Sequence, residues 1–489
     1  VSKLPFRLTD MDFGYHSRQC LAGDSLLYIT SQGSGFFRLY LNHETGDVRF
    51  DPMRYFPSHY CTDILLDKSG NLWVATSKGL FRQDIRRTYV VSGAAPSDIK
   101  EAFPYLSITG MLTVGNELYV GTRGNAGVLV FDKNDLRFLK HLPMGRYADT
   151  AASIYNLIQA GKDTLIMGTN GPMLSLDLRS GKLRFVPVEN WQVGKDWASG
   201  SYKDSKGTIW LAASKMYQYD YATGSCYVSP QAQQFYERNH TPSLFCEDAS
   251  GNLWIAGNGI GRYNPRTNRF DALPDSLPAI RMPDRPVLAL AADMADHIWI
   301  SSYNNGLVRY HPGTQSYLHF TRDNGLPDNN IMALKIVGDK LWMASYSGIA
   351  CLDLKTLSII RYGKEDGFPD LPVVQGTAFY YDSSLHRLYI GFSNEIVSFN
   401  PDSLLKTSPE PDFFIENLVV GKQGRYFLPR APLITNWRNN ELTITLGSIN
   451  YSNSSSQRFA YRIIHEDTSE WHELGTASQF SLSNLPPGH

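Results

Sequence analysis

The chain has 489 residues, and its 46 Lys and Arg residues nearly balance its 47 Asp and Glu residues, which leaves a formal net charge of −1. This balance, with no basic run longer than Arg86-Arg87, argues against capture of nucleic acid. The hydrophobic fraction of 42 % is ordinary for folded domains, but no apolar run approaches the roughly 20 residues of a membrane-spanning helix.

The N-terminus has no charged-then-apolar secretion signal, and the chain does not start with Met. We therefore expect a fragment from which a signal or anchor has been removed.

One unit recurs along most of the chain, and residues 68–80 hold its clearest copy: a polar turn, an aromatic residue within an apolar run, then Gly79-Leu80. The steps between copies are 43 to 47 residues, a period typical of propeller blades. In the second copy, residues 62–67, 71–76, 80–83 and 88–91 are expected to form four short strands. We therefore predict an all-β fold of four-stranded blades stacked around an axis. The residues at the centres of the nine copies are expected in the blade cores: Tyr28, Trp73, Tyr119, Ile166, Trp210, Trp254, Trp299, Trp342 and Tyr389.

Nine blades exceed the usual content of one propeller, which is about four to eight. We predict two blades of a partial N-terminal propeller at residues 1–100 and a seven-bladed β-propeller at residues 101–405, with residues 92–103 as the linker. A single ring of eight or nine blades is the alternative. Residues 410–489 contain short alternating segments that predict an immunoglobulin-like β-sandwich, truncated because its last strands would follow His489.

The chemistry-bearing residues give no sign of a cofactor or metal. The five cysteines lie on different blades without the paired spacing of a zinc or redox site; we expect buried thiols, with a disulfide between blades left open. No P-loop, dinucleotide-binding, GxSxG or HExxH motif is present. For glycoside hydrolysis, the carboxylates to consider in the loops that join the blades are Asp149, Asp196 and Asp328.

Specific phrases resemble a known family. Asp323-Asn324-Gly325-Leu326-Pro327-Asp328-Asn329 ahead of residues 341–349, with a weaker echo at residues 366–369, resembles the two-component-regulator propeller repeat. Residues 388–402 are similar to the closing repeat of the same proteins. Residues 460–463, 470–473 and 482–488 then resemble the Tyr-rich immunoglobulin-like module that follows it.

The resemblance implies the periplasmic sensor region of a hybrid two-component system, a membrane-anchored histidine kinase that detects oligosaccharides. Such sensors typically carry two seven-bladed propellers, whereas this chain lacks about five N-terminal blades and any kinase, receiver or DNA-binding segment. On this interpretation the fragment is not itself an enzyme. It binds an oligosaccharide derived from a polysaccharide and transmits the signal through the C-terminal module, through which we also expect a homodimer.

We expect the ligand on the propeller face formed by the loops between second and third strands and by the loops that join blades. Oligosaccharides need flat aromatic faces and amide or guanidinium donors, and these loops contain both. The candidate ligand-binding residues are Arg123, Tyr147, Asn170, Trp197, Arg281, Tyr303, Asn304, Asn305 and Tyr346. Turn geometry alone would also favour Asn at several of these positions.

Two other functions remain open from the sequence. One is a propeller-fold polysaccharide lyase or other carbohydrate-active enzyme, which would need an acid or base with a carboxylate or metal near the axis. The other is a scaffold whose propeller faces bind protein partners.

Overall fold

The computed structural model of the chain describes its structure over residues 17–22, 26–31, 35–41, 48–50, 55–56, 58–68, 70–84, 90–149, 151, 153–192, 196–198, 200–213, 215–229, 242–257, 259–272, 286–369, 371, 373, 379–405, 412–421, 425–426, 441–449, 459–462, 471–475 and 477–483. The chain forms two compact units, one made of Val1–Arg87 with Lys406–His489 and the other of Thr88–Leu405. Within the described part, no helix is long and apolar enough to cross a membrane.

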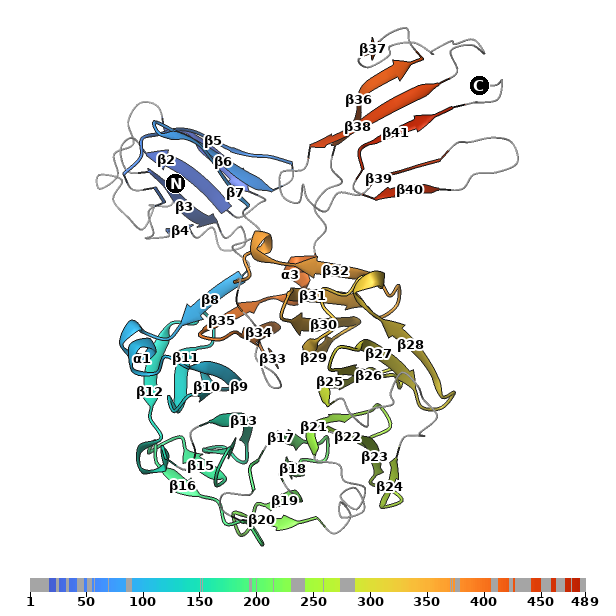
Figure 1. Cartoon of the computed structure of the whole chain (residues 1–489). Helices are drawn as coiled ribbons and strands as arrows, with labels where there is room; N and C mark the ends of the chain where they lie inside the picture. Colours follow the sequence, from blue (N-terminus) through green and yellow to red (C-terminus); the bar gives the residue numbers. More distant parts are fainter. Residues whose placement is uncertain are drawn as a thin grey trace. The chain divides into compact units, whose positions relative to one another are not determined.

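The unit Thr88–Leu405 is a ring of seven four-stranded antiparallel sheets (Figure 1). The first sheet contains β9 (Ser107–Val114), β10 (Glu117–Arg123), β11 (Val128–Asp132) and β12 (Phe138–Leu142). The second contains β13 (Ile154–Gln159), β14 (Thr164–Thr169), β15 (Leu174–Asp177) and β16 (Leu183–Phe185). The third contains β17 (Gly200–Lys203), β18 (Ile209–Ala212), β19 (Met216–Asp220) and β20 (Ser225–Val228). The fourth contains β21 (Pro242–Glu247), β22 (Leu253–Gly257), β23 (Ile260–Asn264) and β24 (Arg269–Ala272).

The remaining ring sheets follow the same order of strands. The fifth contains β25 (Val287–Ala292), β26 (Ile298–Ser302), β27 (Gly306–His311) and β28 (Ser316–Phe320). The sixth contains β29 (Ile331–Val337), β30 (Lys340–Ser345), β31 (Gly348–Asp353) and β32 (Ile359–Tyr362). The seventh contains β33 (Phe379–Asp382), β34 (Arg387–Gly391) and β35 (Glu395–Phe399), and its fourth strand is β8 (Val90–Ala94), from the other end of the unit. The prediction of an all-β propeller fold is confirmed.

The pairing of β8 corrects two expectations from the sequence. Residues 88–91 were predicted as the fourth strand of an N-terminal blade, but β8 pairs with β35 in the register Val90↔Phe399 to Ala94↔Glu395. The proposed linker at residues 92–103 contains the end of β8 and the helix α1 (Ser97–Ala102). The ring therefore begins before residue 101, because closing its last blade requires an outer strand that only the N-terminal side supplies.

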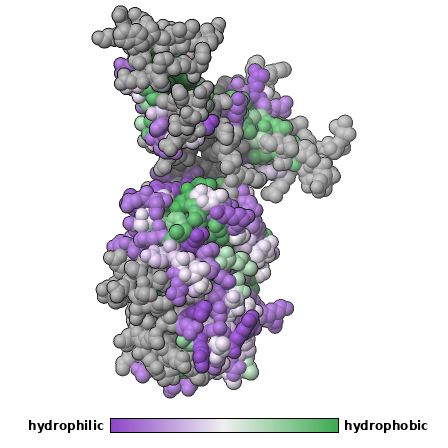
Figure 2. Space-filling view, turned by 90° about the vertical axis from the view of Figure 1, so that its right-hand side faces the viewer, coloured by the Kyte–Doolittle hydropathy of each residue, from purple (hydrophilic) through white to green (hydrophobic). Residues whose placement is uncertain are grey.

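The first strands of successive ring sheets contact each other around the centre of the ring, from β9 through β13, β17, β21, β25 and β29 to β33, and β33 contacts β9 again. This approach is close: a Cβ on Gly200 of β17 would lie 2.1 Å from the carbonyl oxygen of Ser243 in β21. Glycine at this position therefore lets two inner strands meet. The outer surface of the ring on the side of β28 is mostly hydrophilic, interrupted by a hydrophobic area (Figure 2).

Aromatic residues fill the spaces between blades, as the repeat predicts. Trp254, Trp299, Trp342 and Tyr389 are each at most 1 % exposed. In four blades the turn before the second strand supplies an aspartate that accepts a hydrogen bond from the indole N–H six residues later; the pairs are Asp67–Trp73, Asp204–Trp210, Asp248–Trp254 and Asp293–Trp299. The same carboxylates also accept from the backbone N–H four residues later. These hydrogen bonds thus hold the turn against the core of the blade.

Trp342 is the exception to this arrangement. Its hairpin is shorter, so Ile336 stands six residues before it, and its Nε1 atom has no hydrogen-bond partner in the described part of the chain. Its ring packs on Phe399 of the next blade, with centroids 5.0 Å apart.

The N-terminal segment of the other unit contains two sheets. The first has the order β1 (Gln19–Ala22), β2 (Leu26–Ser31), β3 (Gly35–Leu41) and β4 (Val48–Phe50), and the second has β5 (Cys61–Leu66), β6 (Asn71–Thr76) and β7 (Gly79–Asp84). They share a core that includes Tyr28, Phe36, Ile64 and Val74. Because β8 belongs to the ring, the second sheet has three strands.

The C-terminal segment also contains two sheets. One has the order β37 (Arg425–Tyr426), β36 (Asp412–Val420), β38 (Leu442–Ile449) and β41 (Gln479–Leu482); the other pairs β39 (Phe459–Tyr461) with β40 (His472–Gly475). Tyr461 stacks on Phe480 across the two sheets, with ring centroids 4.2 Å apart. The immunoglobulin-like topology stays a prediction, because much of this segment lies outside the described residues.

All five cysteines are free thiols, and four of them are buried: Cys61, Cys226, Cys246 and Cys351. Burial raises the pKa of the Cys226 and Cys351 thiols to about 12. These side chains therefore act as small apolar groups of the blade cores.

Candidate functional site

The loop face of the ring is formed by the loops that join the blades and the loops between the second and third strands of each blade. Strand direction alternates within each antiparallel sheet, so these two kinds of loop emerge at the same end of the ring. In the fifth blade the second-to-third loop is Tyr303-Asn304-Asn305, between β26 and β27. In the sixth blade it is Tyr346-Ser347, and residues 326–330 join the two blades.

A chain of hydrogen bonds connects these three loops. The backbone N–H of Asn304 donates to Asn330 Oδ1 at 2.8 Å, and Asn330 Nδ2 donates back to Asn304 Oδ1 at 2.9 Å. The backbone N–H of Asn330 donates to Asp328 Oδ1 at 2.7 Å. Ser347 Oγ donates to Asp328 Oδ2 at 2.8 Å. The loops of neighbouring blades are thus held in fixed positions by polar side chains.

The conformation of Asn304 explains why this residue type occurs there. Its φ angle is 54°, in the left-handed region, which Asn tolerates better than most residues. Asn304 therefore serves two purposes: its backbone forms the turn, and its side chain pairs with Asn330. Asn305 lies one position further and its carbonyl oxygen is 2.5 Å from His319 Nε2.

Two tyrosines flank this polar chain and are open to solvent. Tyr303 is 51 % exposed and Tyr346 is 54 % exposed, although each follows directly on a buried second strand. An exposed phenol ring beside ordered amide and carboxylate groups can pack against the C–H face of a sugar while its neighbours bind the hydroxyl groups. We refer to Tyr303, Asn304, Asp328, Asn330 and Tyr346 as the loop-face cluster.

The other predicted residues lie on different blades. Arg123, at the end of β10, is exposed, and its guanidinium group lies 5.5 Å from the ring centroid of Tyr155. Asn170 accepts a hydrogen bond from the backbone N–H of Ser153 at 2.8 Å and is exposed. Trp197 is 57 % exposed. They belong to the first three blades, apart from the loop-face cluster of the fifth and sixth.

Tyr147 differs from its predicted role. It is only 3 % exposed and belongs to a hydrophobic core, with its ring edge-on to Phe185 and the guanidinium group of Arg146 over its face. The joining loop forms a short 3₁₀ helix, Gly145–Tyr147, that turns this ring inward. Its face is therefore closed to a sugar. Arg281 lies outside the described residues.

Two of the carboxylates considered for hydrolysis are held by hydrogen bonds within the ring, and the third, Asp149, is exposed. Asp196 is 6 % exposed and accepts a hydrogen bond from the backbone N–H of Gln192 at 2.6 Å. Asp328 is held by Asn330 and Ser347. Among the described residues, no group of three or more metal-binding side chains occurs.

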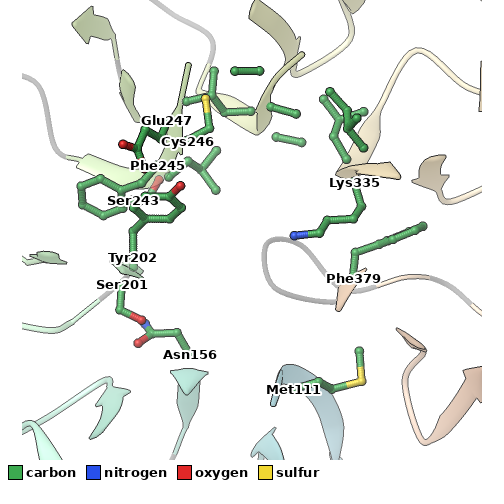
Figure 3. Close-up of a pocket in the computed structure, with 18 of the residues that line it drawn as sticks. Met111, Asn156, Ser201, Tyr202, Ser243, Phe245, Cys246, Glu247, Lys335 and Phe379 are labelled. Atoms are coloured by element: carbon green, nitrogen blue, oxygen red, sulfur yellow. The ribbon is translucent and has the colours of Figure 1, made fainter. Parts of the chain in front are cut away.

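A cavity of about 360 Å³ occupies the centre of the ring. It is lined by residues of all seven inner strands, including Met111, Asn156, Tyr202, Phe245, Lys335 and Phe379. Figure 3 shows Lys335 reaching into this space from one side, near Phe379, while Tyr202, Ser201 and Asn156 lie on the other. The volume falls within the range of small-molecule sites, roughly 300–1,000 Å³.

The charge in this cavity is uneven. Lys335 and Glu247 are the charged residues of the lining. Glu247 lies at the end of β21 and accepts hydrogen bonds from the backbone N–H and the hydroxyl group of Ser205, at 2.7 Å and 2.5 Å. Burial lowers the pKa of Lys335 and raises the pKa of Tyr202 and Cys246. Tyr202 and Cys246 are therefore neutral, and Lys335 is the one basic residue among the described residues of the lining.

The sequence-based prediction did not include Lys335, because it considered residues in loops and Lys335 lies in a strand. A signal was present, since Lys335 is the single charged residue in the otherwise apolar strand Ile331–Val337. Asn330 stands in the loop that joins the fifth and sixth blades, and its pairing with Asn304 depends on how these two blades meet.

Comparison with known proteins identifies the class of repeat. Residues 55–78 match the family model of the two-component regulator propeller, and this segment covers the neighbouring strands β5 and β6. This segment is therefore similar to the two-component regulator propeller repeat, and the resemblance seen in the sequence is confirmed. None of the curated proteins matches the chain.

In fold, the chain is similar to the extracellular domain of the hybrid two component system BT4673 from B. thetaiotaomicron, with a TM-score of 0.50 and 17 % sequence identity. The match covers 96 % of this chain and 65 % of that domain, so the chain spans just under two thirds of its length. A second structure of the BT4673 domain, described there as a one component system, matches with a TM-score of 0.49, 17 % identity and coverage of 97 % and 65 %. The extracellular domain of the hybrid two component system BT3049 from the same organism has a TM-score of 0.36 at 16 % identity, over 96 % of this chain and 74 % of that one.

Proposed function

We propose that this chain is the periplasmic sensor region of a hybrid two-component signalling protein and that it binds an oligosaccharide on the loop face of the ring. The observation that carries the binding proposal is the loop-face cluster, in which two exposed tyrosines flank a fixed chain of amide and carboxylate groups. The family match of residues 55–78 and the fold similarity support the sensor role.

The cluster is suited to binding rather than to bond cleavage. Its hydrogen bonds fix Asn304, Asn330 and Asp328 before a ligand arrives, which lowers the ordering cost of binding. Asp328 accepts hydrogen bonds from Asn330 on one oxygen and from Ser347 on the other, and no hydrogen bond joins it to a second carboxylate among the described residues. We therefore assign the fragment a non-enzymatic role, with kinase activity in the full-length, membrane-anchored protein.

Signalling would pass from the ring to the C-terminal module and then to the membrane. We propose that this module mediates a homodimer, because a ligand can shift a signalling state only by binding one arrangement of the chains better than another. Oligomeric state with and without ligand tests this part of the proposal by sedimentation.

Calorimetric titration with defined oligosaccharides, neutral and acidic, tests the binding itself. Chromatography of the ligand after each titration tells binding from turnover. The double variant Tyr303→Ala with Tyr346→Ala should lose binding at least about tenfold, since stacking on aromatic rings supplies much of the affinity for sugars. Tyr317→Ala is the matched control, because Tyr317 is 40 % exposed on the outer strand β28. Equal binding by the double variant and the control would contradict the assignment, and a cleaved ligand would favour an enzyme.

A further inference from the structure

The position of Lys335 in the ring is occupied by uncharged residues in the other blades. Lys335 pairs across its hairpin with Trp342, the central residue of the repeat. The residues that pair with the equivalent central positions are Leu112, Ile158, Tyr202, Cys246, Ala291 and Tyr380. Of the seven residues that pair with the central positions of the blades, Lys335 is thus the one basic residue.

Lys335 has no compensating charge or hydrogen-bond acceptor in the described part of the chain: no salt bridge or hydrogen bond joins its ammonium group to another described residue. Glu247, the other charged residue of the lining, is bonded to Ser205. A buried ammonium group without a partner is costly. Such a residue is best explained by a ligand that supplies the missing partner of the ammonium group.

Other groups of the same cavity suit the hydroxyl groups and the C–H faces of a sugar. Asn156 is 2 % exposed and its Oδ1 atom has no hydrogen-bond partner among the described residues. Tyr202 and Phe245 stack with ring centroids 6.4 Å apart, and Phe379 lies beside Lys335 (Figure 3). The cavity therefore offers a cation, polar groups and aromatic surface together.

The strand β29 runs from the loop face into the wall of the cavity. Asn330 of the loop-face cluster directly precedes β29, and Lys335 lies four residues into that strand from Ile331, a depth of about 13 Å at 3.3 Å per residue. A ligand bound at the loop face would have to span about this distance to reach Lys335.

We propose that the ring channel around Lys335 is a subsite for the carboxylate of an acidic sugar residue. This deepens the proposed function and rests on it. One ammonium group balances one negative charge, whereas a phosphate dianion would exceed it and would share the cavity with Glu247. The aromatic rings would contact the C–H faces of the sugar.

The test is calorimetric titration of the full chain with sodium glucuronate, sodium galacturonate, glucose and inorganic phosphate. We expect a hexuronate to bind and glucose to bind at least about tenfold more weakly. Lys335→Met should lower hexuronate affinity about tenfold or more, because hydrogen bonds to charged groups are the strong ones. Lys182→Met is the matched control, since Lys182 is exposed outside the channel, and it should bind as the unmodified chain does.

Each outcome decides the proposal. Hexuronate binding that is lost in Lys335→Met and kept in Lys182→Met supports it, even if no oligosaccharide binds at the loop-face cluster. Equal binding by Lys335→Met, no binding of either hexuronate, or tighter binding of phosphate would each overturn it. Binding of a neutral oligosaccharide that depends on Tyr303 and not on Lys335 would leave the proposed function standing and reject the channel subsite. Lys335→Arg, which keeps the charge, should retain binding and guards against a purely structural effect.

Discussion

Two buried tryptophans that occupy the same position in different blades should respond differently to the same substitution. Trp254 is 1 % exposed and its Nε1 donates to Asp248 Oδ2 at 2.8 Å, whereas Trp342 is fully buried and its Nε1 has no partner among the described residues. Replacement by Phe removes similar volume at both sites, so this cost is common to the two variants. The difference between the two variants in free energy of unfolding therefore reports the contribution of the indole N–H.

The magnitude follows from the two hydrogen-bonding states. Trp254→Phe loses a bond to a charged acceptor, worth about 1.5–3 kcal/mol. Trp342→Phe removes an unpaired buried donor, whose desolvation costs about 1–3 kcal/mol. Asp248 keeps the backbone and side-chain N–H groups of Asn252 as donors, which softens the first loss. We therefore expect Trp254→Phe to be less stable than Trp342→Phe by about 3 kcal/mol.

Urea unfolding followed by far-UV circular dichroism measures this difference, because the signal does not depend on the tryptophans removed. Trp299→Phe is the control: Trp299 is buried and donates to Asp293 at 2.9 Å, so it should behave like Trp254→Phe. If Trp342→Phe costs as much as the other two, the hydrogen-bond reasoning is wrong.

Three further predictions concern the ring. A chain of residues 88–405 should melt at a higher temperature than one of residues 101–405, which lacks β8 and leaves β35 as an exposed edge; equal melting temperatures by calorimetry would show that β8 does not close the ring. Lys335→Met should stabilise the unliganded chain, because it removes an unpaired buried charge. Burial lowers the pKa of Lys335 from its ordinary value of 10.5, so between the lowered pKa and 10.5 the unfolded state binds more protons and stability rises with pH. The advantage of Lys335→Met should therefore shrink as pH rises through that window, and a pH-independent advantage in urea unfolding would argue against a buried cation. Finally, Cys226 and Cys351 should react with a thiol reagent only after unfolding, because burial raises their pKa to about 12; rapid reaction of the native chain, located by mass spectrometry, would show that these sites open.

The repeat predicts the ring well, because an apolar or aromatic central residue recurs every 43 to 47 residues and turn residues separate the strands of each blade. The central residues from Tyr119 to Tyr389 lie in seven successive sheets. The partner of the strand at Val90 was not predictable in this way. A short Val-rich segment can pair with any open edge of similar pattern, and only closure of the ring selects β35.

The candidate site was predicted only in part, for a similar reason. Turn preferences locate Asn304 and the exposure of Tyr303 and Tyr346 follows from their place in loops. The amide pair of Asn304 with Asn330 depends on the angle between two blades, which the sequence does not state. Tyr147 was placed in a loop correctly, but a single 3₁₀ turn directs its ring into the core.

The pairing of β8 with β35 means that the chain enters and leaves the ring through one blade. Six of the seven blades have covalent connections only to their neighbours, so the seventh blade carries both connections of the ring to the rest of the chain. The loop-face cluster ends in the sixth blade, and a single blade boundary, where Trp342 meets Phe399, separates it from this common entrance and exit. A ligand that changes how the sixth and seventh blades pack would therefore act on the blade that carries both of these connections.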